Sequence, residues 1–191
     1  MPVKRDKLAT KIGITGNIAS GKSQVEKYLK IRNFIVYDTD KIAHSILDKI
    51  KEFYGYDVFT NGKIDRKKLG NLVFNNTYLK KKLEDLIHPE VKKEILKLFE
   101  KHKNEKYIFI SVPLLFEAGF ENLFDKIILV TVDNDTQLKR LMERNSLTKK
   151  DALLRINSQI PQEEKIGKSD FIVNNNSTIE NLYEQLDKII L

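Results

Sequence analysis

Short apolar runs alternate with helical patterns along this 191-residue chain. A short apolar run bounded by turn residues is typical of a strand buried on both faces. Apolar residues three and four positions apart predict amphipathic helices between such runs. The predicted strands are residues 11–15, 34–37, 107–111, 126–132 and 171–173. The predicted helices are about residues 22–31, 134–144, 148–157 and 178–190.

This alternation predicts an α/β fold, because strands joined by helices form a parallel sheet with helices on both faces. We expect a five-stranded parallel sheet flanked by helices. Residues 41–103 differ, because they are helical in pattern and contain no convincing buried strand. They form an insertion between the second and third strands, interrupted at Asn61-Gly62 and at His88-Pro89. We read His88-Pro89 as a helix start, since Pro favours the first helical position, and Asp65 as a helix cap.

The clearest motif is GNIASGKS at residues 16–23, which fits G-x-x-x-x-G-K-[ST] between a predicted strand and a predicted helix. Gly16 and Gly21 allow the backbone to curl so that its N–H groups point at phosphate oxygens. Only these flanking glycines are expected to be required by the loop. Lys22 reaches the β- and γ-phosphates, and the Ser23 hydroxyl is placed to bind Mg²⁺. The motif therefore predicts binding of a nucleoside triphosphate.

A phosphate loop does not define the reaction. A guanine-reading Asn-Lys-x-Asp motif is absent from the sequence, and the chain is too short for a large motor ATPase. A small kinase fits best. Its second substrate would meet the γ-phosphate beside the loop.

Two carboxylates, Asp38 and Asp40, follow the second predicted strand. They lie at its carboxyl end, the edge where α/β sheets bind ligands. One acid there can hold Mg²⁺ through its water shell, and the other can accept the proton of an attacking hydroxyl. The alternative for either residue is a helix cap.

Arg140 and Arg144 lie four positions apart on one predicted helix. Their planar groups suit phosphate, and a transferring phosphoryl group needs cationic neighbours. Arg144 also ends the helix before a polar segment, which suits a closing lid. A solvated helix face is the alternative for both.

Four further residues are candidates for contact with the acceptor. Leu115 in the segment VPLLFE belongs either to the core or to the wall of an acceptor pocket. Glu117 serves either the water shell of Mg²⁺ or a plain charged surface. His88 has a substrate contact as its second reading, and Arg66 is either a surface charge or a contact to an anionic substrate.

Together these segments resemble the dephospho-CoA kinase family. The resemblance covers about residues 11–185 and rests on ITGNIASGKS, FIVYDTDKIAH, GKIDRKKLGNLVF, LIHPEV, VPLLFEAGF, QLKRLMERN and SDFIVNN, in the family's order. It implies a P-loop kinase fold in one domain spanning residues 1–191. The nucleotide-binding core would be about residues 11–40 and 105–191, with a helical CoA-binding insert at about 41–104 and a small lid at about 144–166.

The resemblance also implies transfer of the ATP γ-phosphoryl group to the ribose 3′-hydroxyl of dephospho-CoA. The family's proposed base matches Asp40, which leaves Asp38 and Ser23 for the metal. Its lid arginine matches Arg144. The expected nucleotide-binding residues are Gly16, Asn17, Ile18, Ala19, Ser20, Gly21, Lys22, Ser23, Gln24, Arg140 and Asn175, the last near the adenine. The expected substrate-binding residues are Asp38, Asp40, Arg66, His88, Leu115 and Glu117.

The chain differs from the family at three positions in or next to the loop. The family commonly has Gly where this chain has Asn17 and Ala19, and Thr where it has Gln24.

Composition narrows the alternatives. The chain has 34 basic and 27 acidic residues and no cysteine, which excludes disulfides, thiolate nucleophiles and cysteine-bound metals. Its longest nearly apolar stretch, residues 107–116, is too short to span a membrane. We expect a cytoplasmic enzyme that uses ATP and Mg²⁺ and binds neither membrane nor nucleic acid, while the sequence carries no indication of oligomeric state. The alternatives are a kinase for another small acceptor, such as a nucleoside or nucleotide, and a basic nucleic-acid-binding protein switched by ATP.

Overall fold

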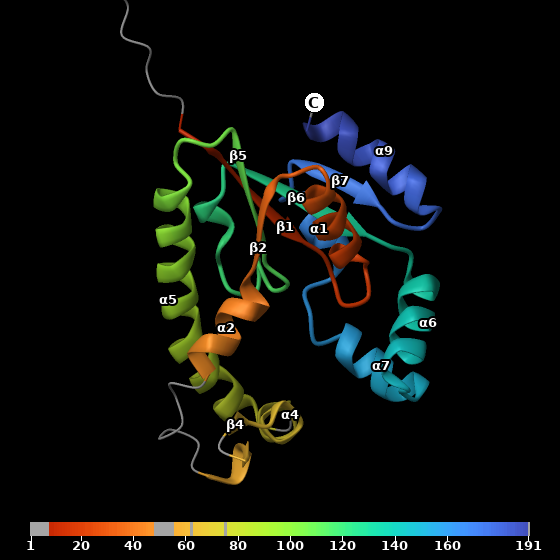
Figure 1. Ribbon diagram of the computed structural model, residues 1–191. Coiled ribbons are helices and arrows are strands. Elements are labelled where there is room, and N and C mark those ends of the chain that lie inside the picture. The colour runs from red at the N-terminus through yellow and green to blue at the C-terminus, as the bar shows by residue number, and fades with distance from the viewer. Residues whose placement is uncertain (1–7, 48–55, 62, 75, 191) are drawn as a thin grey trace, which may run out of the picture. The chain divides into compact units, whose positions relative to one another are not determined.

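The computed structural model describes residues 8–47, 56–61, 63–74 and 76–190 (Figure 1). The chain divides into two compact units. The first unit comprises Met1–Asp38 and His102–Leu191, and the second comprises Thr39–Lys101.

The first unit is built on a five-stranded sheet in the order β2-β5-β1-β6-β7. Every neighbouring pair in it is parallel, so the predicted fold class is confirmed. The predicted strand ranges agree with the observed ones within one residue at each end. The strands are β1 (Thr10–Thr15), β2 (Ile35–Asp38), β5 (Tyr107–Ser111), β6 (Lys126–Thr131) and β7 (Phe171–Asn174).

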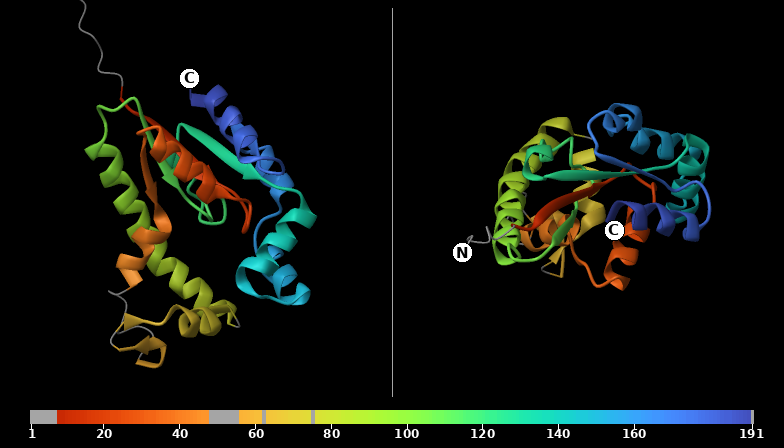
Figure 2. Two further views of the ribbon diagram at one scale, coloured as in Figure 1. Left: turned by 45° about the vertical axis from the view of Figure 1, so that its right-hand side comes forward. Right: turned by 90° about the horizontal axis from the view of Figure 1, so that it is seen from above.

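One face of the sheet is covered by α1 (Lys22–Ile31) and α9 (Ile179–Ile190), which lie side by side in Figure 2. Each helix presents a buried apolar stripe to the strands. The shared core consists of Val25, Tyr28 and Leu29 of α1, Leu182, Leu186 and Ile190 of α9, and Ile12, Ile14, Phe109, Ile128, Val130 and Val173 of the sheet. This packing holds the start of α1 close to the end of β1, and the phosphate loop connects the two.

Three helices follow β6. The helix α6 (Asn134–Asn145) begins at Asp133, whose carboxylate accepts from the Thr136 amide, and α7 (Lys149–Ile156) begins at Thr148 with a similar cap. Both lie within two residues of their predicted ranges. The helix α8 (Gln162–Ile166) was not predicted, because five residues are too few for a periodic signal.

The second unit is mainly helical. It contains α2 (Thr39–Leu47), the 3-10 turn η2 (Tyr56–Val58), α4 (Arg66–Phe74) and α5 (Thr77–Lys101). It also contains a hairpin of two very short strands, β3 (Phe59–Thr60) and β4 (Lys63–Ile64), which carry no buried residue and were not predicted. Asp65 caps α4 by accepting from the Lys68 amide, so its predicted capping role is confirmed.

The prediction that His88-Pro89 starts a helix is wrong. Pro89 lies inside α5, which continues from Thr77 to Lys101. A proline in a helix removes one backbone hydrogen bond and crowds the preceding turn. The periodic burial of Val91, Ile95 and Phe99 beyond it provides packing that outweighs this local cost.

Within the described residues, no helix combines the length and apolar character that crossing a membrane requires.

Candidate active site

The phosphate loop joins β1 to α1 through a backbone that glycine makes possible. Gly21, immediately before the helix, has φ 92°. This left-handed backbone conformation is rarely adopted by residues that carry a side chain. Gly16 lies so close to β6 that an added Cβ would stand 2.6 Å from the Val130 carbonyl oxygen. The Ser20 amide donates to the Asn17 carbonyl across the loop at 3.0 Å. The two flanking glycines are therefore required, as predicted.

The prediction that the loop requires special backbone conformations only at Gly16 and Gly21 misses Ala19. It has φ 62°, so a third loop residue adopts the left-handed region without being glycine. An alanine there carries a backbone strain of about 1 kcal/mol. Similarity to a family that commonly has glycine at this position could have indicated the conformation.

Lys22, Glu26 and Ser111 form a closed triangle of polar contacts beside the loop. Lys22 Nζ donates to Glu26 Oε1 at 2.8 Å and also to Ser111 Oγ. Ser111 Oγ in turn donates to Glu26 Oε1 at 2.6 Å. The loop cation is thus held by a carboxylate one turn further along α1 and by the hydroxyl at the end of β5.

Glu26 is ionised in this triangle. Glu26 as a whole is 8% exposed. Burial raises the pKa of the Glu26 carboxyl, but hydrogen bonds from Lys22 and Ser111, with the charge of Lys22, outweigh it and hold that pKa below its ordinary value. Lys22 therefore faces a fixed negative charge.

Asp38 and Ser111 end neighbouring strands at the same level. They are register partners in the parallel pair of β2 and β5, and Ser111 is likewise the partner of Ile14 in β1. Asp38 is half-buried, at the carboxyl edge of the sheet where it was predicted. The structure therefore brings Asp38 to the same sheet edge as the Lys22 triangle.

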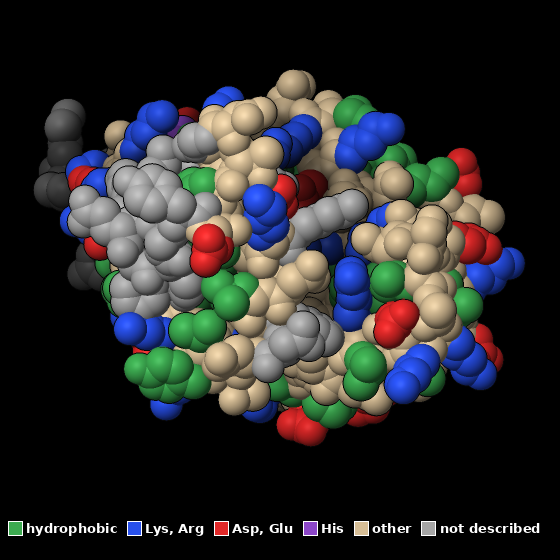
Figure 3. Space-filling view, turned by 90° about the horizontal axis from the view of Figure 1, so that it is seen from below, with side chains coloured by type: hydrophobic (Ala, Val, Ile, Leu, Met, Phe, Trp, Pro, Cys, Tyr) green, Lys and Arg blue, Asp and Glu red, His purple; other side chains and the backbone are tan. Residues whose placement is uncertain are grey.

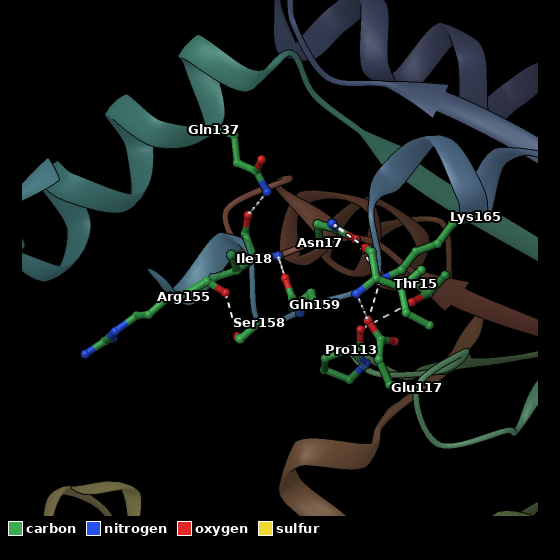
Figure 4. Close-up of polar contacts among 11 residues, drawn as sticks. Thr15, Asn17, Ile18, Pro113, Glu117, Gln137, Arg155, Ser158, Gln159 and Lys165 are labelled. Atoms are coloured by element: carbon green, nitrogen blue, oxygen red, sulfur yellow. Dashed lines mark hydrogen bonds and ion pairs between the residues drawn. The ribbon is translucent and has the colours of Figure 1, made fainter. Parts of the chain in front are cut away.

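A second set of contacts fastens the loop to the segment between α7 and α8 (Figure 4). Asn17 Nδ2 donates to the Ile160 carbonyl at 3.1 Å, and the Ile18 amide donates to Gln159 Oε1 at 2.7 Å. Lys165 Nζ, from α8, donates to Asn17 Oδ1 at 2.7 Å. The side chain of Asn17 thus links the loop to α8.

Glu117 completes this attachment. Its Oε1 accepts from Lys165 Nζ at 2.7 Å and from the Ile160 amide at 3.1 Å (Figure 4). Its Oε2 is buried without a hydrogen-bond partner in the described part of the chain. One carboxylate oxygen of Glu117 is therefore engaged within the protein.

The helix α6 contacts the loop and carries Arg140 and Arg144. Gln137 Nε2 donates to the Ile18 carbonyl at 2.8 Å, so this face of α6 meets the loop. Arg140 lies three residues later on the same face, and its Nη1 is buried with no partner among the described residues. Arg144 is exposed, and its Nε donates to Asn145 Oδ1 at 2.9 Å. A buried guanidinium donor without a partner beside a phosphate loop suits an anionic ligand.

Asn175, the residue after β7, supports the loop. Its Nδ2 donates to the Ser20 carbonyl at 2.8 Å, and its backbone amide donates to Thr131. It is buried. Contact of Asn175 with the adenine stays a prediction.

The remaining predicted residues fall in different places. Leu115 is fully buried, with a side-chain carbon against Gly13 of β1, as its core reading expects. Asp40 in α2 and His88 in α5 belong to the second unit, where Asp40 is exposed and His88 is half-buried. Arg66 begins α4, and its side chain lies outside what the structure describes.

The donor set at the loop suits a cation that arrives with the nucleotide. In the described part of the chain, no cluster of three or more His, Cys, Asp or Glu side chains could hold a metal by itself. Mg²⁺ does not need one, because it keeps several waters and takes one or two protein ligands together with substrate phosphates. Ser23 at the start of α1 and Asp38 at the carboxyl edge of the sheet fit that requirement.

Several site residues escaped the sequence analysis. Gln159 and Lys165 meet the loop from more than 130 residues away in sequence, and nothing local marks them. Glu26 carried a weak signal: it is four residues after Lys22 and borders the apolar stripe of α1.

Charge is mixed over the face of the molecule that Figure 3 shows. Lys and Arg side chains are interspersed with Asp and Glu there. A nucleic-acid-binding surface is typically a patch of one sign.

The comparisons with known proteins agree with each other. The family model for dephospho-CoA kinase matches residues 10–181. A dephospho-CoA kinase of Fusobacterium nucleatum is 44% identical over 184 residues, covering 93% of this chain and 95% of that protein. The structure of a dephospho-CoA kinase from Campylobacter jejuni has 36% identity, a TM-score of 0.71 and 94% coverage of both chains.

A crystal structure from Thermus thermophilus is also similar, with a TM-score of 0.82, 31% identity and coverage of 95% and 96% of the two chains. The expected P-loop kinase fold is thereby confirmed. Because the family model and its relatives span nearly the whole sequence, the chain belongs to the dephospho-CoA kinase family.

Proposed function

We propose that this chain transfers the γ-phosphoryl group of ATP to the 3′-hydroxyl of the ribose of dephospho-CoA, giving coenzyme A and ADP. The observation that carries the choice of acceptor is the unbroken match of the family model from residue 10 to residue 181. That match includes the second unit, which has no part in the phosphate loop. We interpret the second unit as the CoA-binding insert.

On the nucleotide side, the amides of residues 16–23 and the first turn of α1 bind the phosphates. Lys22 exchanges Glu26 for the β- and γ-phosphates and stabilises the charge that builds on the bond that breaks. Arg140 and Arg144 neutralise the transferred group from α6. The unpartnered Nη1 of Arg140 supports this role.

Mg²⁺ fits beside these phosphates, with Ser23 and Asp38 as the residues that would hold it. When bound, it supplies positive charge that offsets the negative charge of the triphosphate. The residues themselves position the reactants: the loop fixes the phosphates, and the arginines fix the transferred group.

On the acceptor side, Asp40 accepts the proton of the 3′-hydroxyl as that oxygen bonds to the γ-phosphorus and the bond from phosphorus to the β-phosphate oxygen breaks. Arg66 and His88 contact the anionic acceptor. Glu117 contributes to the wall of the acceptor pocket, and Leu115, which is fully buried, supports that wall from the core.

The test is ATP turnover across a panel of acceptors, with the purified full chain. Dephospho-CoA should stimulate ADP formation well above the background without acceptor, and nucleosides, nucleotides and shikimate should not. NMR of the product should show the new phosphate on the ribose 3′-oxygen. Stimulation by a nucleoside or nucleotide alone would replace this proposal with the other small-acceptor kinase.

A further inference from the structure

Glu26 is a buried acid in the phosphate-loop helix that the loop motif does not explain. Its Oε1 lies 2.8 Å from Lys22 Nζ and 2.6 Å from Ser111 Oγ. The carboxylate is fixed by both contacts, so it has one defined position next to the residue that meets the phosphates. Burying an acid at such a place is costly unless a cation is always present.

The strand beside the loop strand ends in a neutral residue. In P-loop NTPases, Mg²⁺ is held by the loop Ser or Thr and by a second residue, the Walker B aspartate. Here β5, which pairs with β1, ends at Ser111, and the first acid after it is Glu117, which binds Lys165. The hydroxyl of Ser111 instead donates to Glu26. One negative charge beside the end of β5 thus comes from α1.

We propose that Glu26 supplies the second carboxylate that faces the Mg²⁺ of the bound nucleotide, through the water shell of that ion. The proposal rests on the proposed function in one respect, that the loop binds ATP with Mg²⁺. It adds a residue that neither the loop motif nor the family resemblance contributes, and it gives Ser111 the role of orienting Glu26.

Charge balance explains why the cation and Glu26 belong together. Lys22 neutralises Glu26 through their ion pair at 2.8 Å. Once the phosphates attract Lys22, the buried carboxylate loses its partner, and an unpaired buried charge is strongly unfavourable. A divalent cation that arrives with the same phosphates replaces the lost charge. Asp38, the register partner of Ser111, borders the same place from β2.

The competing explanation is structural. Lys22 and Glu26 are four residues apart on one helix, and such a pair can stabilise the helix and nothing else. The two explanations differ in one measurable quantity, which is the gain in nucleotide affinity that the metal provides. A helix pair has no effect on that gain.

The experiment measures the dissociation constant of ADP by calorimetry, once in EDTA and once with Mn²⁺, and takes the ratio as the metal gain. Glu26→Gln keeps the size and both contacts but removes the charge. We expect its metal gain to fall about tenfold or more, as is usual when a residue that orients a metal's surroundings is lost. Glu184→Gln, an exposed acid on α9, is the matched control and should keep the wild-type gain. Thermal unfolding of each variant checks its fold.

Moving the charge tests the proposal from the other side. Glu26→Gln with Ser111→Asp places a carboxylate at the end of β5, and most of the metal gain should return. A Glu26→Gln gain within twofold of wild type overturns the proposal and leaves the helix pair. A reduced gain that Ser111→Asp does not restore, together with weaker ADP binding in EDTA, indicates a damaged loop and also overturns it. No acceptor is used, so a wrong acceptor in the turnover panel leaves this result unaffected.

Discussion

Lys165 Nζ lies 2.7 Å from Glu117 Oε1, and the Lys165 side chain has no exposure to solvent. The same ammonium group donates to Asn17 Oδ1 at 2.7 Å. One buried cation therefore joins α8 to the phosphate loop and to the segment that follows β5. A buried lysine is unfavourable by itself, so this contact persists only because both oxygens are in place.

Removal of Lys165 should destabilise the protein and loosen the loop. Lys165→Met leaves the partly exposed Glu117 and the buried Asn17 without their cation. We expect a cost of about 3 kcal/mol, near the low end for a buried pair, because Glu117 is partly exposed. Urea unfolding measures this cost. Lys168→Met, which removes an exposed lysine close by, should change the midpoint little. In Lys165→Met, the KM for ATP should rise by a larger factor than kcat falls. Lys165→Arg, which keeps the charge, should restore part of the affinity for ATP. Equal stability of both methionine variants would contradict the role of the buried cation.

The sheet and the phosphate loop could be predicted from sequence because their signals are local. Each buried strand is a continuous apolar run, and the loop motif has fixed spacing between a strand and a helix. Even the capping role of Asp65 follows from its immediate neighbours.

Contacts between distant segments could not be predicted in the same way. The sequence around Lys165 and Gln159 does not distinguish them from an exposed lysine and an exposed glutamine, although both contact the loop. The prediction of a helix start at His88-Pro89 was wrong for a related reason. Pro89 is a strong local signal for a helix start, whereas the packing of Val91, Ile95 and Phe99 that keeps α5 continuous is tertiary. For Asp40, Arg66 and His88, the assigned roles still depend on the family resemblance.

Lys22→Met should abolish most catalysis while the protein still folds. Methionine keeps the length of the side chain but removes the charge that faces the breaking bond. We expect kcat/KM to fall by about 10²–10⁴. Circular dichroism should show a folded protein, because Ser111 still donates to Glu26. The midpoint of thermal unfolding should be lower than in wild type, because Glu26 loses its cation. A variant with near-normal turnover would contradict the assignment of the loop lysine.

Gly21→Ala should disrupt the loop because the position is left-handed and crowded. At φ 92° an alanine is strained, and its Cβ would overlap Asn175 Nδ2. Asn175 would have to leave the Ser20 carbonyl that it binds. We expect a loss of stability of about 1–3 kcal/mol and at least a tenfold weaker binding of ADP. Gly167→Ala, at φ −67° with open space around it, is the matched control and should leave both quantities unchanged.

Asp170 should make stability depend on acid pH. Burial raises the pKa of its carboxyl, but hydrogen bonds from Lys126 Nζ and the Ile127 amide outweigh this and hold that pKa below its ordinary value of 3.8. The unfolded chain therefore binds the proton first as pH falls, so this stabilisation is complete above about pH 5 and is lost as pH falls through the lower folded-state value. Urea midpoints of wild type and Asp170→Asn should differ at pH 7 and converge toward pH 3. In a Lys126→Gln background the difference at pH 7 should be smaller. A constant difference across this range would exclude the titration of Asp170 as its cause.

The roles of Asp38, the last residue of β2, and of Asp40, two residues later, should separate when each is changed to its amide. If Asp40 accepts the hydroxyl proton, Asp40→Asn lowers kcat by about 10²–10⁴ and leaves the KM for ATP nearly unchanged, since the lost interaction belongs to the transition state. The loss approaches the low end if the transition state is loose, because such a reaction requires little from a base.

Asp38→Asn should instead raise the Mg²⁺ concentration required for half-maximal rate, with a smaller loss at saturating metal. Paired kcat measurements and Mg²⁺ titrations with dephospho-CoA decide between them. A nearly inactive Asp38→Asn beside a metal-dependent Asp40→Asn would exchange the two roles, and wild-type rates in both would place the acceptor site elsewhere.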